Sequence, residues 1–174
     1  MTTCADPLPV VAALGLGGNL GDPVEAMARA LQALDRREDS AMLAVSGLYR
    51  TPPWGKTDQA DFFNACALVK TTLSPSDLLD CCLDLERAMK RVRLERWGPR
   101  TLDIDILFYG DRVVAEDHLH IPHPRMLERA FVLKPLADIA PDHVIAEKAI
   151  SEWLGTVDAS DINLADGSAG WWRR

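Results

Sequence analysis

Arg96-Trp97-Gly98-Pro99-Arg100-Thr101-Leu102-Asp103-Ile104-Asp105-Ile106-Leu107 combines guanidinium, indole and carboxylate groups with a predicted strand. Apolar and acidic residues alternate in its second half, which predicts one apolar face formed by Leu102, Ile104, Ile106 and Phe108. Asp103 and Asp105 then share the other face, about 7 Å apart along the strand, and can bind one cation or flank two. Magnesium prefers carboxylate and phosphate oxygens, so the pair predicts a magnesium site. The alternative is an ordinary half-buried strand with a hydrated acidic face.

A basic cluster precedes this strand. Its members are Arg87, Lys90, Arg91, Arg93, Arg96 and Arg100, with Glu95 as the acid among them. Guanidinium groups bind phosphate oxygens through a planar fork, so the cluster indicates a phosphate ligand. Gly98 and Pro99 break a helix, which predicts a loop over residues 91–99 that closes over the ligand. The alternative is a solvated helix face with pairs such as Glu86 and Lys90.

Composition limits the classes of protein to consider. The chain has 174 residues, of which 48% are hydrophobic, and predicts one domain over residues 1–174. Neither a membrane span nor a targeting segment is expected, and four cysteines without a regular spacing predict reduced thiols and a cytoplasmic protein. The net charge of −7 argues against a nucleic-acid or anionic-membrane surface. Residues 151–174 are expected to form a C-terminal extension of unclear role.

The order of predicted elements gives the fold class. Strands are expected at 10–16, 43–50, 62–71 and 102–108, and helices at 22–36 and 74–92, with shorter helices at 124–130, 132–139 and 149–154. Gly110 and Asp111 predict a hairpin turn with a return strand at 113–114. The order strand, helix, strand, strand, helix, strand predicts an α+β ferredoxin-like sandwich, a mainly antiparallel sheet flanked by helices.

Four separated motifs resemble one known family. They are Tyr49–Gly55, Asp61–Ala65, Arg96–Leu107 and Ile121–Pro124, and the resemblance extends from about Val10 to about Val144. The family is hydroxymethyl-dihydropterin pyrophosphokinase, an enzyme of the folate pathway. The resemblance implies transfer of pyrophosphate from ATP to the hydroxymethyl group of 6-hydroxymethyl-7,8-dihydropterin, with release of AMP. It also implies two magnesium ions as cofactors, small-molecule partners and a monomeric enzyme.

The resemblance also implies roles for individual residues. Asp103 and Asp105 would bind the metal ions and, with Arg91 and Arg100, form the catalytic group. The nucleotide would be bound by Glu86, Arg93, Trp97, Arg100, Ile106, His123 and Arg129. The pterin would be bound by Thr51, Pro52, Trp54, Phe62, Asn64, Trp97 and Phe131. Glu86 is expected to lie off the apolar face of its helix, and Gly17 and Asn19 are expected to support the site structurally.

Two other functions fit parts of the pattern. A magnesium-dependent nucleotidyltransferase also uses a glycine turn and an Asp-x-Asp strand, but it attacks the α-phosphorus and releases pyrophosphate. A ferredoxin-like RNA-binding module would use the arginine cluster and an exposed tryptophan. Its affinity for single strands would depend on salt and survive Asp103→Ala, and the net charge of −7 counts against it.

Overall fold

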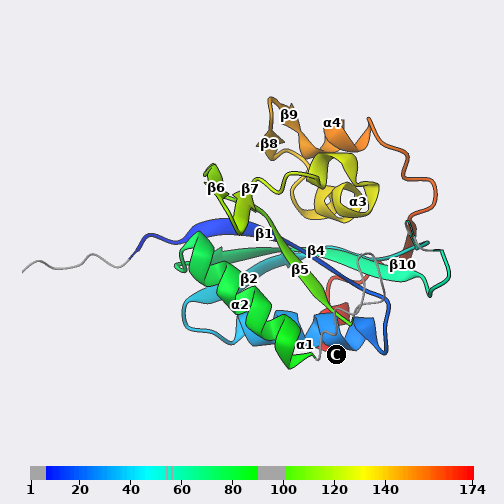
Figure 1. The fold of residues 1–174 in the computed structure, drawn as a ribbon, viewed down its shortest axis with the longest axis horizontal. Coiled ribbons are helices and arrows are strands. Elements are labelled where there is room, and N and C mark those ends of the chain that lie inside the picture. Colours follow the sequence, from blue (N-terminus) through cyan, green and yellow to red (C-terminus); the bar gives the residue numbers. More distant parts are fainter. Residues whose placement is uncertain (1–6, 54, 56, 90–100) are drawn as a thin grey trace, which may run out of the picture.

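The computed structural model describes residues 7–53, 55, 57–89 and 101–174. Its main sheet is antiparallel and has the order β10-β3-β4-β1-β5, with β2 also paired to β4 (Figure 1). These strands are β1 (Val10–Gly18), β2 (Ser40–Val45), β3 (Leu48–Thr51), β4 (Phe62–Thr71), β5 (Asp103–Tyr109) and β10 (Asn163–Asp166). The order confirms the predicted α+β sandwich built on an antiparallel sheet.

Helices cover both faces of the sheet (Figure 1). One face carries α1 (Pro23–Asp35) and α2 (Pro75–Ala88), and the other carries α3 (Ala130–Ile139) and α4 (Ile150–Leu154). The first two helices begin as their sequences predict, with proline in the first turn and a capping side chain before it. Asp22 Oδ1 accepts the Glu25 amide at 3.0 Å, and Ser74 Oγ accepts the Asp77 amide at 3.1 Å.

The sheet separates two apolar cores. The core under α1 and α2 contains Leu14, Leu31, Leu34, Leu78, Ile104 and Ile106. The core under α3 and α4 contains Ala13, Leu107, Phe108, Leu133, Leu136 and Ile150. Each core therefore draws on both strands β1 and β5.

A bulge in β5 corrects the predicted alternation. Leu14 pairs with Ile106 while Ala13 pairs with Phe108, so Leu107 is an extra residue in the ladder. As a result Leu107 and Phe108 both face α3. The prediction that Phe108 shares a face with Ile104 and Ile106 was therefore wrong.

The predicted strand 43–50 is interrupted at Ser46. Both β2 and β3 pair with β4, one after the other. Between them the Ser46 amide donates to the Cys66 carbonyl, and the Cys66 amide donates to Ser46 Oγ, both at 2.9 Å. A side-chain oxygen thus replaces a backbone carbonyl at the break, which satisfies the Cys66 amide and ends β2.

The chain after β5 also differs from its prediction. The strand after Gly110 is β6 (Val114–Glu116), which pairs with β7 (Leu119–Ile121) and not with β5. The Gly110 amide donates to the Val11 carbonyl, which directs the chain away from β5.

The helical region that follows also differs from its prediction. In place of a helix at 124–130 there is a 3-10 turn at Met126–Glu128, after which α3 begins at Ala130. The short strands β8 (Val144–Ile145) and β9 (Lys148–Ala149) form a hairpin before α4.

The C-terminal residues pack on the sheet and on α1. Strand β10 pairs with β3, and a final 3-10 turn, η2 (Trp171–Arg173), lies against α1. Both tryptophans are buried, and Gln32 Nε2 of α1 donates to the Trp172 carbonyl at 2.8 Å. No helix in the described part of the chain is long and apolar enough to cross a membrane.

The core under α3 and α4 can be tested by a substitution in its centre. Leu133 of α3 is fully buried against the sheet, whereas Leu43 on β2 is 53% exposed. We expect Leu133→Ala to lower the free energy of unfolding by about 2–5 kcal/mol, because it leaves a cavity. Leu43→Ala, the matched control, should cost less than about 1 kcal/mol. Urea denaturation measures both, and equal losses would contradict a packed second core.

Candidate active site

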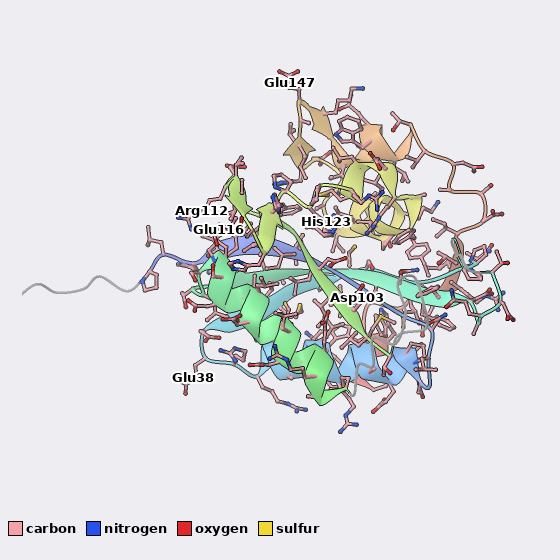
Figure 2. All side chains as sticks on the ribbon, viewed as in Figure 1. Glu38, Asp103, Arg112, Glu116, His123 and Glu147 are labelled. Atoms are coloured by element: carbon pink, nitrogen blue, oxygen red, sulfur yellow. The ribbon has the colours of Figure 1, made fainter. Side chains whose placement is uncertain are left out.

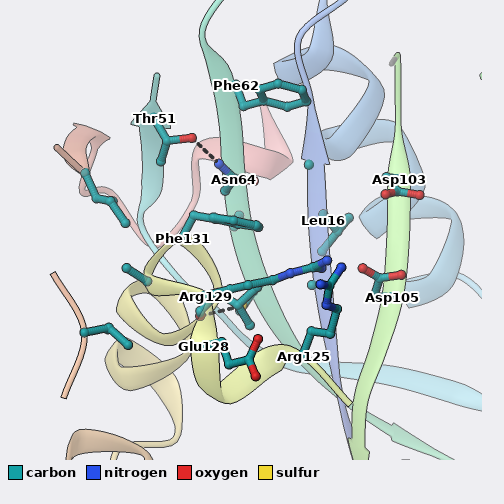
Figure 3. A pocket seen from close by; sticks show the side chains of 18 of the residues that line it. Leu16, Thr51, Phe62, Asn64, Asp103, Asp105, Arg125, Glu128, Arg129 and Phe131 are labelled. Atoms are coloured by element: carbon teal, nitrogen blue, oxygen red, sulfur yellow. Dashed lines mark hydrogen bonds between the residues drawn. The ribbon is translucent and has the colours of Figure 1, made fainter. Parts of the chain in front are cut away.

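A cavity of about 690 Å³ lies on the α3 face of the sheet, at the start of that helix (Figure 3). Its floor consists of strands β1, β3, β4 and β5, and the 3-10 turn and first turn of α3 form one wall. Gly15 and Gly17 of β1 lie in the middle of the floor, where the missing side chains leave space.

The register of the sheet places the two ends of the cavity. Gly17 pairs with Asn64 on one side and with Asp103 on the other, and Gly15 pairs in the same way with Cys66 and Asp105. Adjacent strands are about 4.8 Å apart, so Asn64 and Asp103 are about 10 Å apart across the floor. The pairing therefore brings an amide end and an acidic end into one cavity.

The acidic end confirms the predicted arrangement of β5. Asp103 and Asp105 are half-buried and point into the cavity from the same face of the strand (Figure 3). Between them, the Ile104 amide donates to Glu86 Oε1 of α2 at 2.8 Å. Glu86 is only 3% exposed, so the prediction that it lies off the buried face of its helix was wrong. Its carboxylate fixes the strand that carries both aspartates.

His123 lies next to this end of the cavity. Its amide donates to the Leu107 carbonyl at 2.8 Å, and its Nε2 lies 3.8 Å from Asp105 Oδ2. Nδ1 accepts the Arg125 amide at 3.2 Å, which leaves the proton of the neutral ring on Nε2, facing Asp105. Burial, helped by the charge of Arg129, lowers the pKa of His123 to about 4, so the ring is neutral at pH 7.

Basic side chains face the two aspartates. Arg125 and Arg129 reach over the floor toward β5 (Figure 3). The Arg129 guanidinium lies 5.7 Å from the centre of the Phe131 ring, so a cation and an aromatic face occur side by side. Arg129 was predicted from sequence. Arg125 and Glu128 also line the cavity and were missed, although Arg125 directly follows the Ile121–Pro124 motif.

The amide end is buried and ordered by hydrogen bonds. Asn64 Nδ2 donates to Thr51 Oγ1 at 2.9 Å. Both residues are buried, with 7% of Asn64 and 6% of Thr51 exposed. Phe62 lies to one side of this pair and Phe131 to the other (Figure 3). The bond orients the Asn64 amide, a group that carries both hydrogen-bond donors and an acceptor.

Glycine and asparagine support this end, as predicted. A Cβ on Gly17 would lie 2.8 Å from Asn64 Oδ1, so only glycine leaves room for the amide. Asn19 Nδ2 donates to Gln59 Oε1 and to the Ala60 carbonyl, both at 2.9 Å, which ties the end of β1 to the segment before β4.

The cavity unites most of the predicted site residues that the structure describes. They are Thr51, Pro52, Phe62, Asn64, Asp103, Asp105, Arg129 and Phe131. The side chain of Ile106 lies in the core under α1 and α2, so a ligand contact would have to come from its main chain. The predicted residues Trp54, Arg91, Arg93, Trp97 and Arg100 lie outside the described residues.

Three exposed glutamates lie far from the aspartate pair. Glu38, Glu116 and Glu147 lie at the periphery of the molecule, while Asp103 lies on β5 and His123 close to it (Figure 2). Among the described residues, no group of three or more histidine, cysteine, aspartate or glutamate side chains could hold a metal ion. A magnesium ion at the aspartate pair would take oxygen atoms as its further ligands.

The C-terminal segment forms part of the cavity wall, which the sequence did not predict. Val157, Asp158, Asp161 and Ile162 line the cavity between α4 and β10. No local pattern in residues 157–162 indicates this placement, because it depends on the pairing of β10 with β3, more than a hundred residues earlier in the chain.

Comparisons with known proteins agree on one family. The family model of 7,8-dihydro-6-hydroxymethylpterin-pyrophosphokinase matches residues 13–141. A 2-amino-4-hydroxy-6-hydroxymethyldihydropteridine pyrophosphokinase of Methylorubrum extorquens is 48% identical over 153 residues, which cover 88% of this chain and 97% of that relative. A folic acid synthesis protein of Schizosaccharomyces pombe is 37% identical over 156 residues, covering 88% of this chain and 21% of the yeast protein.

A solved structure shows the same fold. The crystal structure of wild-type Plasmodium falciparum HPPK-DHPS matches with a TM-score of 0.70 over 87% of this chain, at 18% identity. This chain spans 44% of that longer chain, less than half of its length.

The contact at Gly17 predicts an asymmetry between two glycines on the same strand. Gly17→Ala must displace the Asn64 amide and break its bond to Thr51, so we expect a loss of about 1–3 kcal/mol in the free energy of unfolding. At Gly15 the added Cβ meets the flexible end of Leu107 at 3.3 Å, so Gly15→Ala should cost less. Chemical denaturation of both variants measures the difference, and an equal or reversed order would contradict the packing of Asn64 on Gly17.

Proposed function

Because the chain belongs to the 7,8-dihydro-6-hydroxymethylpterin-pyrophosphokinase family, we propose that the cavity between Asn64 and the aspartate pair is its active site. The enzyme transfers pyrophosphate from ATP to 6-hydroxymethyl-7,8-dihydropterin, a step of folate biosynthesis that releases AMP. One observation carries the assignment of the site. Asn64, Gly17 and Asp103 are paired in one row across the sheet, so a ring held at one end presents its substituent to the other.

The pterin occupies the amide end in this proposal. Its amino-pyrimidine edge has donors and acceptors, which Asn64 can match in the orientation set by Thr51. Phe62 and Phe131 offer aromatic surface to the ring, and Pro52 lines the same region. Trp54 and Trp97 are proposed as further pterin contacts from the resemblance. The ring is thereby held with its hydroxymethyl group toward β5.

The acidic end would hold magnesium. Asp103 and Asp105 fit this role because they are accessible, share one face and supply only oxygen ligands. Bound there with ATP, two magnesium ions would neutralise the charge of the phosphate oxygens and polarise the attacking hydroxyl group. The protein's own contribution is geometric, because Glu86 holds the backbone between the two aspartates.

Cationic and neutral donors complete the phosphate site. Arg129 and Arg125 face the aspartates and would bind phosphate oxygens, while His123 donates from neutral Nε2 at pH 7. Arg91, Arg93 and Arg100, with Ile106 and Glu86, remain proposed nucleotide contacts. The hydroxyl oxygen of the pterin forms a bond to the β-phosphorus of ATP and gives up its proton to water, while the bond between that phosphorus and the α,β-bridging oxygen breaks and AMP leaves with the bridging oxygen.

The wider setting stays a prediction. We expect one chain to contain the whole site and to act as a monomer in the cytoplasm, without a nucleic-acid or membrane partner. Residues 1–174 are expected to form a single catalytic unit that includes the C-terminal segment.

Loss of one carboxylate tests the metal assignment. We expect Asp105→Asn to lower kcat/KM by about a hundredfold or more, because a ligand worth several kcal/mol is removed at the transition state. The variant should also need more magnesium for half-maximal rate. AMP formation from ATP and hydroxymethyl-dihydropterin measures both effects.

Asp111→Asn is the matched control, because Asp111 is an exposed aspartate in the turn just after β5. It should retain the wild-type rate. Equal activity of the two variants would refute the metal role of Asp105, and release of pyrophosphate in place of AMP would refute the assigned reaction.

A second prediction addresses the amide end. Asn64→Ala should raise the KM for the pterin by about tenfold or more, because a buried ring edge loses its hydrogen-bond partners. The KM for ATP should stay within about twofold, since Asp103 and Asp105 lie on a different strand. Steady-state kinetics with each substrate varied in turn measures the split, and a parallel rise of both constants would contradict a pterin-specific role.

A further inference from the structure

The short strand β3 carries Thr51 but has little support of its own. It contains four residues, and only Tyr49, Arg50 and Thr51 pair with β4. The pairing of the preceding strand β2 with β4 is interrupted at Ser46. The register of β2 on β4 therefore does not continue regularly into β3. Contacts from other parts of the chain therefore add to this three-residue pairing with β4 in fixing the position of Thr51.

The C-terminal segment supplies such contacts from one edge and one face. Strand β10 pairs along the outer edge of β3, with Asn163 opposite Arg50 and Leu164 opposite Tyr49. Beyond it, Trp171 Nε1 donates to the Ser46 carbonyl at 2.9 Å. Trp171 is only 5% exposed, so this bond fixes the break in the ladder from inside the core.

Other bonds fix the same break from the opposite face and anchor the tail. Asp138 of α3 accepts the Gly47 amide at 3.2 Å and the Tyr49 hydroxyl at 2.9 Å. Gln32 of α1 donates to the Trp172 carbonyl at 2.8 Å. The segment from α4 to the C-terminus is thus held at both ends, while its middle part, 157–162, lines the cavity.

We infer that the C-terminal segment from Val157 to Trp172 belongs to the pterin half of the active site, with Trp171 as a positioning residue. The indole bond to Ser46 aligns β3, β3 places Thr51, and Thr51 orients the Asn64 amide. The inference rests on the proposed role of Asn64 in pterin binding. The aspartate pair lies on β5, on the far side of β1, so ATP binding should be independent of this chain of contacts.

Trp171→Phe tests the inference, because it removes the indole N–H and keeps most of the apolar ring. We expect the KM for the pterin to rise by about three- to tenfold, the effect of one misplaced hydrogen-bonding pair, with the KM for ATP within about twofold of wild type. Equilibrium binding of the pterin should weaken by the same factor. Substrates are varied separately in the intact chain.

Trp153→Phe is the matched control. Its Nε1 donates to the Ile145 carbonyl at 2.8 Å, so the same substitution removes the same kind of bond beside α4. This variant should keep both KM values. If Trp171→Phe gives no larger pterin effect than Trp153→Phe, or raises both constants together, the inference is overturned.

Gln32→Ala decides the matter if Trp171→Phe does not fold. It removes the amide that holds the Trp172 carbonyl and places a favourable helix residue on α1. The same selective rise in the pterin KM, but smaller, is expected, and an unchanged KM overturns the inference.

Asn64→Ala distinguishes a failure of the proposed pterin site from a failure of the proposed role of the tail. No pterin effect in Asn64→Ala refutes the proposed pterin site, whereas an effect there without one in the tail variants refutes only the role of the tail.

Discussion

The antiparallel ladder between β1 and β4 is the constraint on which the rest of the structure depends. It runs from Val10 opposite Thr71 to Gly18 opposite Phe63, and β1 pairs with β5 on its other side. Because β1 lies between the strand with Asn64 and the strand with the aspartates, its register sets their distance. Gly15 and Gly17 have no side chains, so the space above β1 between these two strands is free for a ligand.

Local patterns in the sequence were sufficient for the main elements. The proline and capping residues at Asp22 and Ser74 predicted both long helices, and the alternation of Asp103 and Asp105 with isoleucines predicted the acidic face of β5. These features depend on neighbours within a few residues, which is why a single sequence reveals them. The resemblance of four motifs then predicted one site from residues on distant strands, and most of those that the structure describes line one cavity.

Features that depend on distant partners were missed. The extra residue Leu107 is visible only against Ala13 and Leu14, and the break at Ser46 only against Cys66. Glu86 is a charged residue that was expected off the apolar face of its helix, yet its carboxylate accepts the Ile104 amide of β5, a distant partner that helps to satisfy it in the core. The C-terminal tryptophans carried no periodic signal, because their partners lie on α1 and at the strand break.

The bulge at Leu107 divides the α3 face of β5 into an acidic part and an apolar part. Before it, the side chains toward α3 are carboxylates; after it, Leu107 and Phe108 both enter the apolar core below that helix. A strand of strict alternation would have sent Phe108 to the opposite core and left α3 with less to pack on. The single inserted residue thus lets the helix that bears Phe131 dock firmly beside a charged cavity. Anyone transplanting this strand into another scaffold would have to carry the insertion with it, since the acidic half and the docking half are separated by that residue.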